Sequence, residues 1–158
     1  MQSVKKSSWM TEYLPNGKKT LVITSCSKKK NSSEKLIRSS ERYIGQMFNA
    51  TKKFSEENDY DLLIISAKYG LLSSEEKITN YDQRLTTKKQ AIDLRPCVLP
   101  KLKKIISENH YSRIIIIMGK LYRYILEELY DSRFIILEST NGIFDYLKKL
   151  SELNRAII

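Results

Sequence analysis

The sequence predicts an α/β fold built on a mainly parallel sheet of about four strands. Four short apolar runs, rich in β-branched residues, alternate with segments that have the periodicity of amphipathic helices. The runs lack alternation of polar and apolar residues, which indicates strands buried on both faces, as in a parallel sheet covered by helices on each side. The predicted strands are Thr20–Thr24, Leu62–Ser66, Ile114–Met118 and Phe134–Leu137.

Helices are expected after three of these strands. The first should span about Ser40–Glu57, where apolar residues recur at three- and four-residue spacing from Tyr43 to Phe54. The same spacing predicts helices over Lys120–Tyr130 and about Ile143–Leu153. The order of elements is therefore β-α-β-α-β-α-β-α.

The connection from Ala67 to about Tyr111 is longer than one loop and one helix require. Long connections of this kind are often functional. Its expected elements are a short helix capped by Thr86 or Thr87 and ending at Leu94, a break at Pro96 and Pro100, and a helical piece over Leu102–Glu108.

Length and composition favour one cytoplasmic domain. The 158 residues lie within the range of roughly 100–200 typical of one domain, so residues 1–158 are expected to form it, with 1–19 as a loose arm or edge element. Two cysteines make no disulfide framework, and no signal peptide is evident. The longest apolar run is far below the roughly 18 residues that span a bilayer, so no membrane partner is expected.

The net charge predicts an anionic partner. Lysine and arginine number 28 against 18 acidic residues, which gives a formal charge of +10. A basic domain of this kind is a candidate for binding a nucleic acid or a nucleotide. The alternative is that lysine pairs scattered over the helices only keep the surface solvated. Nothing in the sequence indicates an oligomeric state.

The loop after the first strand carries hydroxyl, thiol and ammonium groups together. In open α/β sheets, ligands bind outside the carboxyl ends of the strands, so this loop is a candidate site. Anion binding is expected from Ser25, Ser27, Lys28 and Lys30. Cys26 is a candidate nucleophile because neighbouring lysines favour a thiolate, although a small cysteine at a strand end can also be a packing residue.

The loop after the second strand, and a segment ten residues later, carry a second polar set. Lys68 supplies charge, Tyr69 an aromatic face for a base, and Gly70 a turn or a close backbone approach. Further along, Tyr81, Asp82 and Arg84 could combine acid/base chemistry with an anion clamp. The alternative is a hydrogen-bonded cluster that only anchors the long connection.

Two further loops are weaker candidates. Gly119, at a strand-to-helix turn, permits a ligand to approach helix amides, or is an ordinary tight turn. Glu138 could be a carboxylate paired with Asp82, or a cap partner. No motif requires a cofactor and no cluster has zinc spacing, but Asp82 and Glu138 could hold Mg²⁺ together with substrate phosphates.

Several of these segments together are similar to a known family. Ser-Cys-Ser-Lys-Lys-Lys after a strand, Arg-Tyr-Ile-Gly-Gln-Met-Phe in a helix, Ile-Ser-Ala-Lys-Tyr-Gly-Leu-Leu and Ile-Thr-Asn-Tyr-Asp resemble small proteins related to the peroxide-stress protein YaaA, over about Leu21–Leu85. The resemblance implies a Rossmann-like three-layer domain, an active site at the strand ends and a link to nucleic-acid or nucleobase metabolism. The matching positions are Ser25, Cys26, Lys28, Lys30, Tyr43, Lys68, Tyr69, Gly70, Tyr81 and Asp82.

The leading hypothesis is a nucleic-acid or nucleotide-processing enzyme that acts on a base or on its glycosidic or phosphate linkage. In this hypothesis Asp82, Cys26 and Lys68 are the catalytic candidates. The first alternative is a metal-dependent nuclease that uses Asp82 and Glu138. The second is a non-catalytic nucleic-acid-binding module.

Overall fold

A computed structural model describes residues 19–138 and 143–157, with the side chains of 143 and 154–157 left undescribed. Its main sheet has five strands in the order β4-β3-β1-β6-β7. The predicted strands are confirmed as β1 (Lys19–Ser25), β3 (Asp61–Ser66), β6 (Tyr111–Ile117) and β7 (Phe134–Leu137), and all four run parallel. Of the arm expected at residues 1–19, residues 1–18 lie outside the described residues, and Lys19 is instead the first residue of β1.

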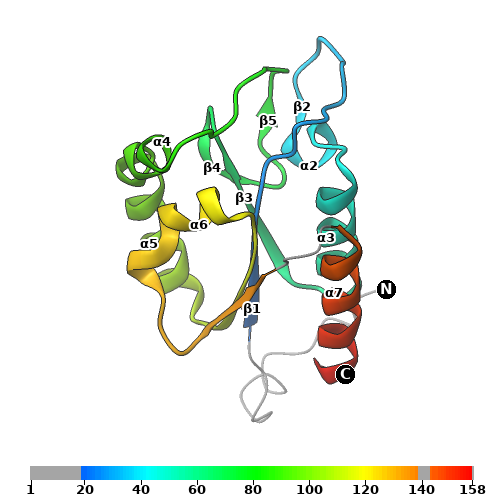
Figure 1. Cartoon of the computed structure of the whole chain (residues 1–158), viewed down its shortest axis with the longest axis vertical. Coiled ribbons are helices and arrows are strands. Elements are labelled where there is room, and N and C mark those ends of the chain that lie inside the picture. Colours follow the sequence, from blue (N-terminus) through cyan, green and yellow to red (C-terminus); the bar gives the residue numbers. More distant parts are fainter. Residues whose placement is uncertain (1–18, 139–142, 158) are drawn as a thin grey trace.

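Helices lie on both sides of the sheet (Figure 1). One side carries α3 (Gln46–Glu57) and α7 (Ile143–Ile157). The other carries α4 (Lys88–Asp93), α5 (Arg95–Asn109), α6 (Lys120–Leu126) and a 3₁₀ turn at Glu127–Leu129.

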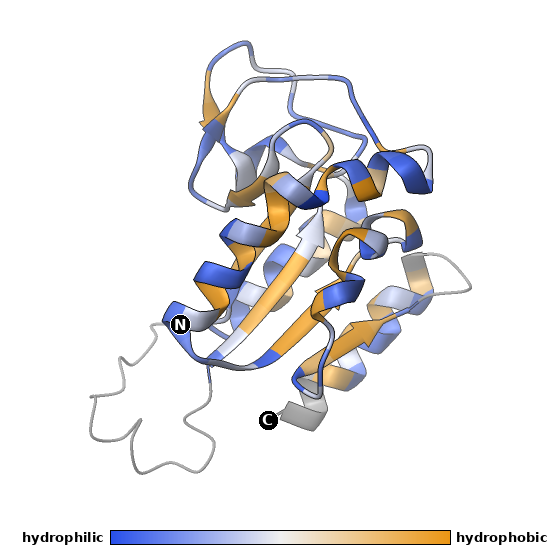
Figure 2. Ribbon diagram, turned by 90° about the vertical axis from the view of Figure 1, so that its left-hand side faces the viewer, coloured by the Kyte–Doolittle hydropathy of each residue, from blue (hydrophilic) through white to orange (hydrophobic). Residues whose placement is uncertain are grey.

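Burial on both faces explains why the strands read as continuous apolar runs. In β1, Leu21 and Ile23 belong to the core cluster under α5 and α6, whereas Val22 between them belongs to the cluster under α3 and α7. All three side chains are fully buried. The central strands are accordingly coloured as hydrophobic in Figure 2, and the loops above them are mostly hydrophilic.

The fifth strand corrects the expected count of about four. Residues Gly70–Ser73 form β4, which turns back antiparallel to β3, with Ser66 opposite Gly70. The segment reads as a loop in the sequence because it is short and follows polar residues directly. Gly70 has φ +75°, a left-handed conformation that glycine adopts without the strain of a Cβ atom and that permits the tight turn.

Side chains occupy the open edge of β4. The carbonyl of Ser73 accepts a hydrogen bond from Ser39 Oγ at 2.7 Å, and its amide donates to Glu76 Oε1 at 3.0 Å. The carbonyl of Leu71 accepts from Lys101 Nζ at 3.0 Å. These bonds satisfy edge groups that could otherwise pair with another chain.

The helix expected over Ser40–Glu57 is two helices. A short α2 (Ser39–Arg42) ends at Tyr43, whose extended backbone (φ −90°, ψ 124°) pairs with Lys30, and α3 begins after Gly45. The periodic spacing of apolar residues therefore continues across a break between two helices.

A second, two-stranded antiparallel sheet lies beside this break. It consists of β2 (Ile37–Arg38) and β5 (Lys77–Ile78), and the sequence did not predict it because each strand has only two residues.

The long connection is helical for much of its length. Thr87 caps α4, as expected, through a reciprocal pair of hydrogen bonds with Gln90. The expected break at Pro96 and Pro100 is wrong, because α5 runs from Arg95 through both prolines. Pro96 occupies the first turn of α5, where no amide donor is needed. Pro100 is exposed and removes one helical hydrogen bond. The helix forms nevertheless, and it buries Val98, Leu99, Leu102 and Ile106.

Within the described ranges, no helix is long and apolar enough to cross a membrane.

Candidate active site at the carboxyl ends of the strands

A hollow of ≈ 400 Å³ opens at the carboxyl ends of β1 and β6. The chain leaves β1 towards β3 on one side and returns to β6 on the other, so the hollow lies at the point where strand order reverses. Such switch points are where open α/β sheets bind ligands. The wall consists of Thr24–Lys29 from the first loop, Gly45–Phe48 at the start of α3, Ile117–Gly119 and Tyr146.

Groups that can bind an anion lie at the rim of the hollow. Lys28 and Lys29 are exposed at its rim. The first-turn amides of α3 receive no side-chain cap, because the N-cap residue is Gly45. Gly119 adds open space, since a Cβ atom placed on it would meet nothing within 4 Å.

Ser27 holds the first loop against α3. Its Oγ accepts a hydrogen bond from the Gly45 amide at 3.2 Å and donates to the Lys29 carbonyl at 2.6 Å. A Cβ atom on Gly45 would lie 2.7 Å from Ser27 Cβ, so glycine is required for this close approach. The Ser27 hydroxyl thus already has two partners within the protein.

Cys26 lies at the wall of the hollow, and its Sγ is 3.2 Å from the hydroxyl oxygen of Tyr122. Burial raises the pKa of Tyr122, so this phenol stays protonated at neutral pH. Tyr122 is not among the site residues that the sequence predicts. The available signal was its position in the first turn of the helix that follows Gly119, which places it at the same edge of the sheet as Cys26.

Three hydroxyl groups form a hydrogen-bonded chain beside Cys26. The Tyr81 oxygen is 2.5 Å from that of Tyr43 and 2.8 Å from Ser66 Oγ. Burial raises the pKa of Tyr43 to about 12 and raises that of Tyr81 further. Tyr43 and Tyr81 were expected at the site, whereas the hydroxyl of Ser66, the last residue of β3, was not singled out.

Two lysines lie near the ring of Tyr81. The ring centroid is 4.5 Å from Lys30 Nζ and 5.7 Å from Lys68 Nζ. Lys68 Nζ is also 5.2 Å from the ring centroid of Tyr69, whose hydroxyl is 2.5 Å from Thr79 Oγ1. Neither lysine forms an ion pair with a described carboxylate. Four predicted site residues, Lys30, Lys68, Tyr69 and Tyr81, therefore meet around one exposed edge.

Asp82 and Arg84 are exposed, and neither has a hydrogen bond or ion pair with any other residue that the structure describes. Asp82 nevertheless lies over the second loop, because Tyr81 contacts Ser66 and Gln83 Nε2 donates to the Ala67 carbonyl at 3.2 Å. The suggested hydrogen-bonded cluster of Tyr81, Asp82 and Arg84 is therefore wrong for Asp82 and Arg84. Tyr81 and Gln83 anchor the segment instead.

Two other predicted site residues have distinct surroundings. Ser25 ends β1 and lines the hollow. Gly70 faces α5, where a Cβ atom would be 3.6 Å from Cys97 and 3.7 Å from Val98. Its role in the structure is the β3–β4 turn rather than an approach to the hollow.

Glu138 follows β7 and forms an ion pair with Arg123. The hydrogen bond that Arg123 donates within this ion pair holds the pKa of the Glu138 carboxyl below its usual range. In the part of the chain that the structure describes, no group of three or more histidine, cysteine, aspartate or glutamate side chains is placed to hold a metal ion. The rest of the loop expected here, Ser139–Gly142, lies outside the described residues.

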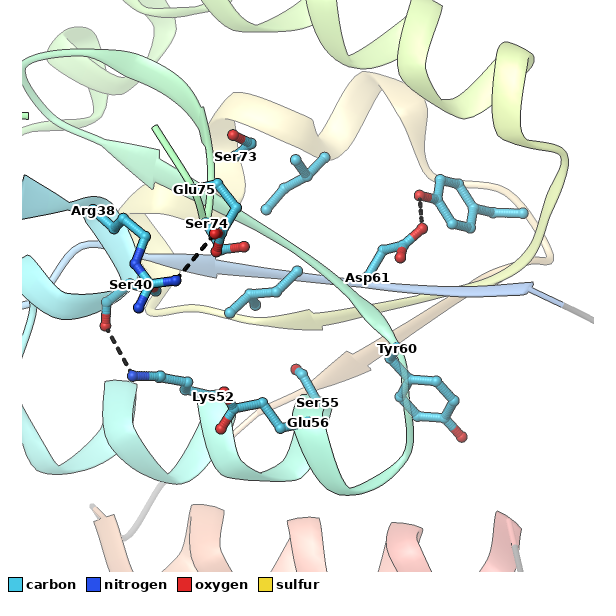
Figure 3. Close-up of a pocket in the computed structure, with 13 residues that line it drawn as sticks. Arg38, Ser40, Lys52, Ser55, Glu56, Tyr60, Asp61, Ser73, Ser74 and Glu75 are labelled. Carbon is cyan, nitrogen blue, oxygen red and sulfur yellow. Dashed lines mark hydrogen bonds and ion pairs between the residues drawn. The ribbon is translucent and has the colours of Figure 1, made fainter. Parts of the chain in front are cut away.

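A second hollow, of ≈ 410 Å³, lies between α3, the start of β3 and the end of β4 (Figure 3). Several of its polar groups already have partners within the protein. Arg38 pairs with Glu75, Lys52 Nζ donates to the Ser40 carbonyl at 3.3 Å, and Tyr111 hydrogen-bonds to Asp61. This internal pairing makes it a weaker ligand site than the hollow at the strand ends.

The fold and the polar edge define an α/β protein with a candidate ligand site at the carboxyl ends of β1, β3 and β6. The chain belongs to a family of unknown function, DUF6884, whose family model matches residues 21–152. No curated protein and no solved structure matches the chain.

Proposed function

We propose that this protein is an enzyme that processes a nucleotide or nucleic acid, acting on a base or on its glycosidic or phosphate linkage. The observation that carries the proposal is the hollow at the β1/β6 switch point, with Cys26 in its wall and exposed lysines at its rim. The volume of ≈ 400 Å³ is within the range of small-molecule sites.

The surroundings of the hollow suit the parts of a nucleotide. The amides of α3 with Lys28 and Lys29 suit a phosphate, and Tyr146 and Tyr69 are aromatic surfaces available to a base. The formal charge of +10 favours the same class of partner. The proposal includes a Rossmann-like three-layer domain of the YaaA-like kind, a relationship that rests on the sequence resemblance.

Cys26 is the nucleophile candidate in this proposal, and Lys68 and Asp82 assist as charge and acid/base groups. The hydroxyl of Tyr122 is positioned to hydrogen-bond with the sulfur in either protonation state. The thiolate form of a cysteine is the one that attacks an electrophile.

A substitution that fills the hollow tests directly whether the reaction takes place there. The backbone of Gly119 (φ −66°, ψ 165°) accepts any side chain, so Gly119→Phe should place a ring in the open space without strain, and Gly119→Ala is the matched control. Each variant is incubated with nucleoside mono- and triphosphates and with short single-stranded DNA and RNA, and products are separated by liquid chromatography with mass detection. We expect turnover by the wild type and by Gly119→Ala, and at least a tenfold loss with Gly119→Phe.

Parallel reactions separate the alternatives. Turnover that disappears with a chelator and returns with Mg²⁺ would support the metal-dependent nuclease instead. Binding of these compounds without turnover under any metal condition would support the binding module. Equal turnover by Gly119→Phe and wild type would show that the chemistry is elsewhere.

A further inference from the structure

The direction of each hydrogen bond in the Tyr43–Tyr81–Ser66 chain follows from a count of donors and acceptors. A serine hydroxyl has one hydrogen to donate and two lone pairs that accept. Ser66 Oγ accepts the amide of Lys68 at 3.1 Å and the amide of Tyr69 at 3.0 Å, which uses both lone pairs. The Ser66 hydroxyl must therefore donate its own hydrogen to the Tyr81 oxygen.

Tyr43 also donates to Tyr81. Its side chain is fully buried, and among the described residues Tyr81 is the one hydrogen-bond partner of its hydroxyl. If Tyr43 accepted instead, its hydrogen would have no acceptor, and an unsatisfied buried donor costs about 1–3 kcal/mol. The favoured arrangement points the Tyr43 hydrogen at the Tyr81 oxygen.

The Tyr81 oxygen thus receives two hydrogen bonds, and its own hydrogen has no acceptor among the residues that the structure describes. Burial keeps Tyr81 protonated by raising its pKa, so this hydrogen is present at neutral pH. Tyr81 is half-buried, whereas Tyr43 is fully buried. The ammonium groups of Lys30 and Lys68 lie near its ring with no described carboxylate paired to them.

We propose that Tyr81, Lys30 and Lys68 form a phosphate-binding site, in which the Tyr81 hydroxyl donates its free hydrogen to a phosphate oxygen and the lysines supply positive charge. A directed donor, with two ammonium groups near the ring that carries it, matches an oxyanion with several acceptor oxygens. The inference deepens the proposed function and rests on it for the identity of the molecule that carries the phosphate. That phosphate is either a terminal monoester or an internal diester.

Paired tyrosine variants test the direction of the hydrogen bonds. The probes are a 3′-fluorescein-labelled tetradeoxythymidylate with and without a 5′-phosphate, followed by fluorescence anisotropy, and inorganic phosphate, followed by calorimetry. Tyr81→Phe should weaken binding by about 10-fold or more, the scale of a hydrogen bond to a charged group, while Tyr43→Phe, which leaves the Tyr81 hydrogen in place, should weaken binding clearly less. Tighter binding of the phosphorylated probe indicates a terminal phosphate, and equal binding indicates a diester.

A lysine series keeps the test informative if Tyr81→Phe does not fold. Lys30→Met and Lys68→Met should each weaken binding several-fold more than Lys53→Met, an exposed lysine on α3 that serves as the charge-matched control. Equal effects of the three lysine variants, or equal effects of Tyr43→Phe and Tyr81→Phe, would overturn the phosphate site.

The outcomes also separate this inference from the proposed function. If Tyr81→Phe binds and turns over an oligonucleotide as wild type does, the phosphate site is wrong and the proposed function stands. If inorganic phosphate binds in a Tyr81-dependent way but no nucleotide or oligonucleotide binds, the site stands and the proposed function fails. Binding of neither probe by the wild type contradicts both.

Discussion

Arg42 and Ile78 are joined by a hydrogen bond of 3.1 Å from the guanidinium Nη2 to the backbone carbonyl, in a fully buried environment. The same guanidinium donates to the carbonyls of Asn31, Ser33 and Lys35 at 2.7–2.8 Å. One side chain therefore ties the end of the first loop to β5. The segment that carries Tyr81 begins just after Ile78, so Arg42 also sets where the phosphate-site residues lie.

Arg42→Met should destabilise the protein strongly, because four carbonyl oxygens lose their donor. A loss of about 3 kcal/mol is expected, which corresponds to a decrease of about 6–12 °C in Tm. Thermal unfolding followed by circular dichroism measures this change. Arg38→Met is the control, since Arg38 forms exposed ion pairs with Glu41 and Glu75 and should leave Tm nearly unchanged. Equal Tm values for the two variants would contradict the structural role of Arg42.

The main sheet could be predicted because its signal is local. Each parallel strand is a run buried on both faces, as Leu21, Val22 and Ile23 illustrate. The break at Tyr43 could not be predicted, because the residue bridges to Lys30 and the periodic spacing continues across the gap. Tertiary contacts also determine where α5 runs, because the packing of Leu102 and Ile106 in the core outweighs the helical hydrogen bond lost at Pro100.

The site could be predicted as a set of loops but not as a network. Loops after parallel strands share one edge, so Cys26, Lys30 and Lys68 were expected together. Cys26 and Tyr122 are in contact although they are 96 positions apart in the sequence, and a local sequence pattern cannot predict such a contact. The carboxylate of Asp82 is the group with acid/base chemistry in this segment, whereas Tyr81 and Gln83 make its contacts, because adjacent residues in an extended chain point in opposite directions.

Lys28→Ala combined with Lys68→Ala should weaken binding of a single-stranded oligonucleotide and reduce its salt dependence. Each lysine that neutralises a phosphate releases counterions, so the slope of log K against log salt should fall by about 0.7 per lost contact. Fluorescence anisotropy between low and moderate salt measures both quantities. Lys103→Ala with Lys104→Ala, on the exposed side of α5, is the charge-matched control. An affinity that does not change with salt would contradict an anionic ligand at this edge.

Cys26→Ser should keep the fold and most ligand binding. A serine hydroxyl is similar in size and can still hydrogen-bond to Tyr122. The informative measurement is turnover, compared with that of Cys97→Ser, which changes an exposed cysteine outside the hollow. Complete loss of turnover at unchanged Tm in Cys26→Ser alone identifies a covalent thiol mechanism. Full activity would assign Cys26 to packing.

Asp82→Asn tests whether the exposed carboxylate next to Tyr81 takes part in chemistry. The structure assigns Asp82 no hydrogen bond or ion pair with other described residues, so the variant should leave Tm unchanged. If Asp82 is a general acid or base, turnover should fall by about 10²-fold or more with little change in substrate affinity. Steady-state kinetics and thermal unfolding of the same preparation measure the two effects, with Asp93→Asn on α4 as an exposed control. A lower Tm with full specific activity would show instead that Asp82 anchors the segment over the strand ends, and the acid/base role would then pass to the lysine and tyrosine groups around Tyr81.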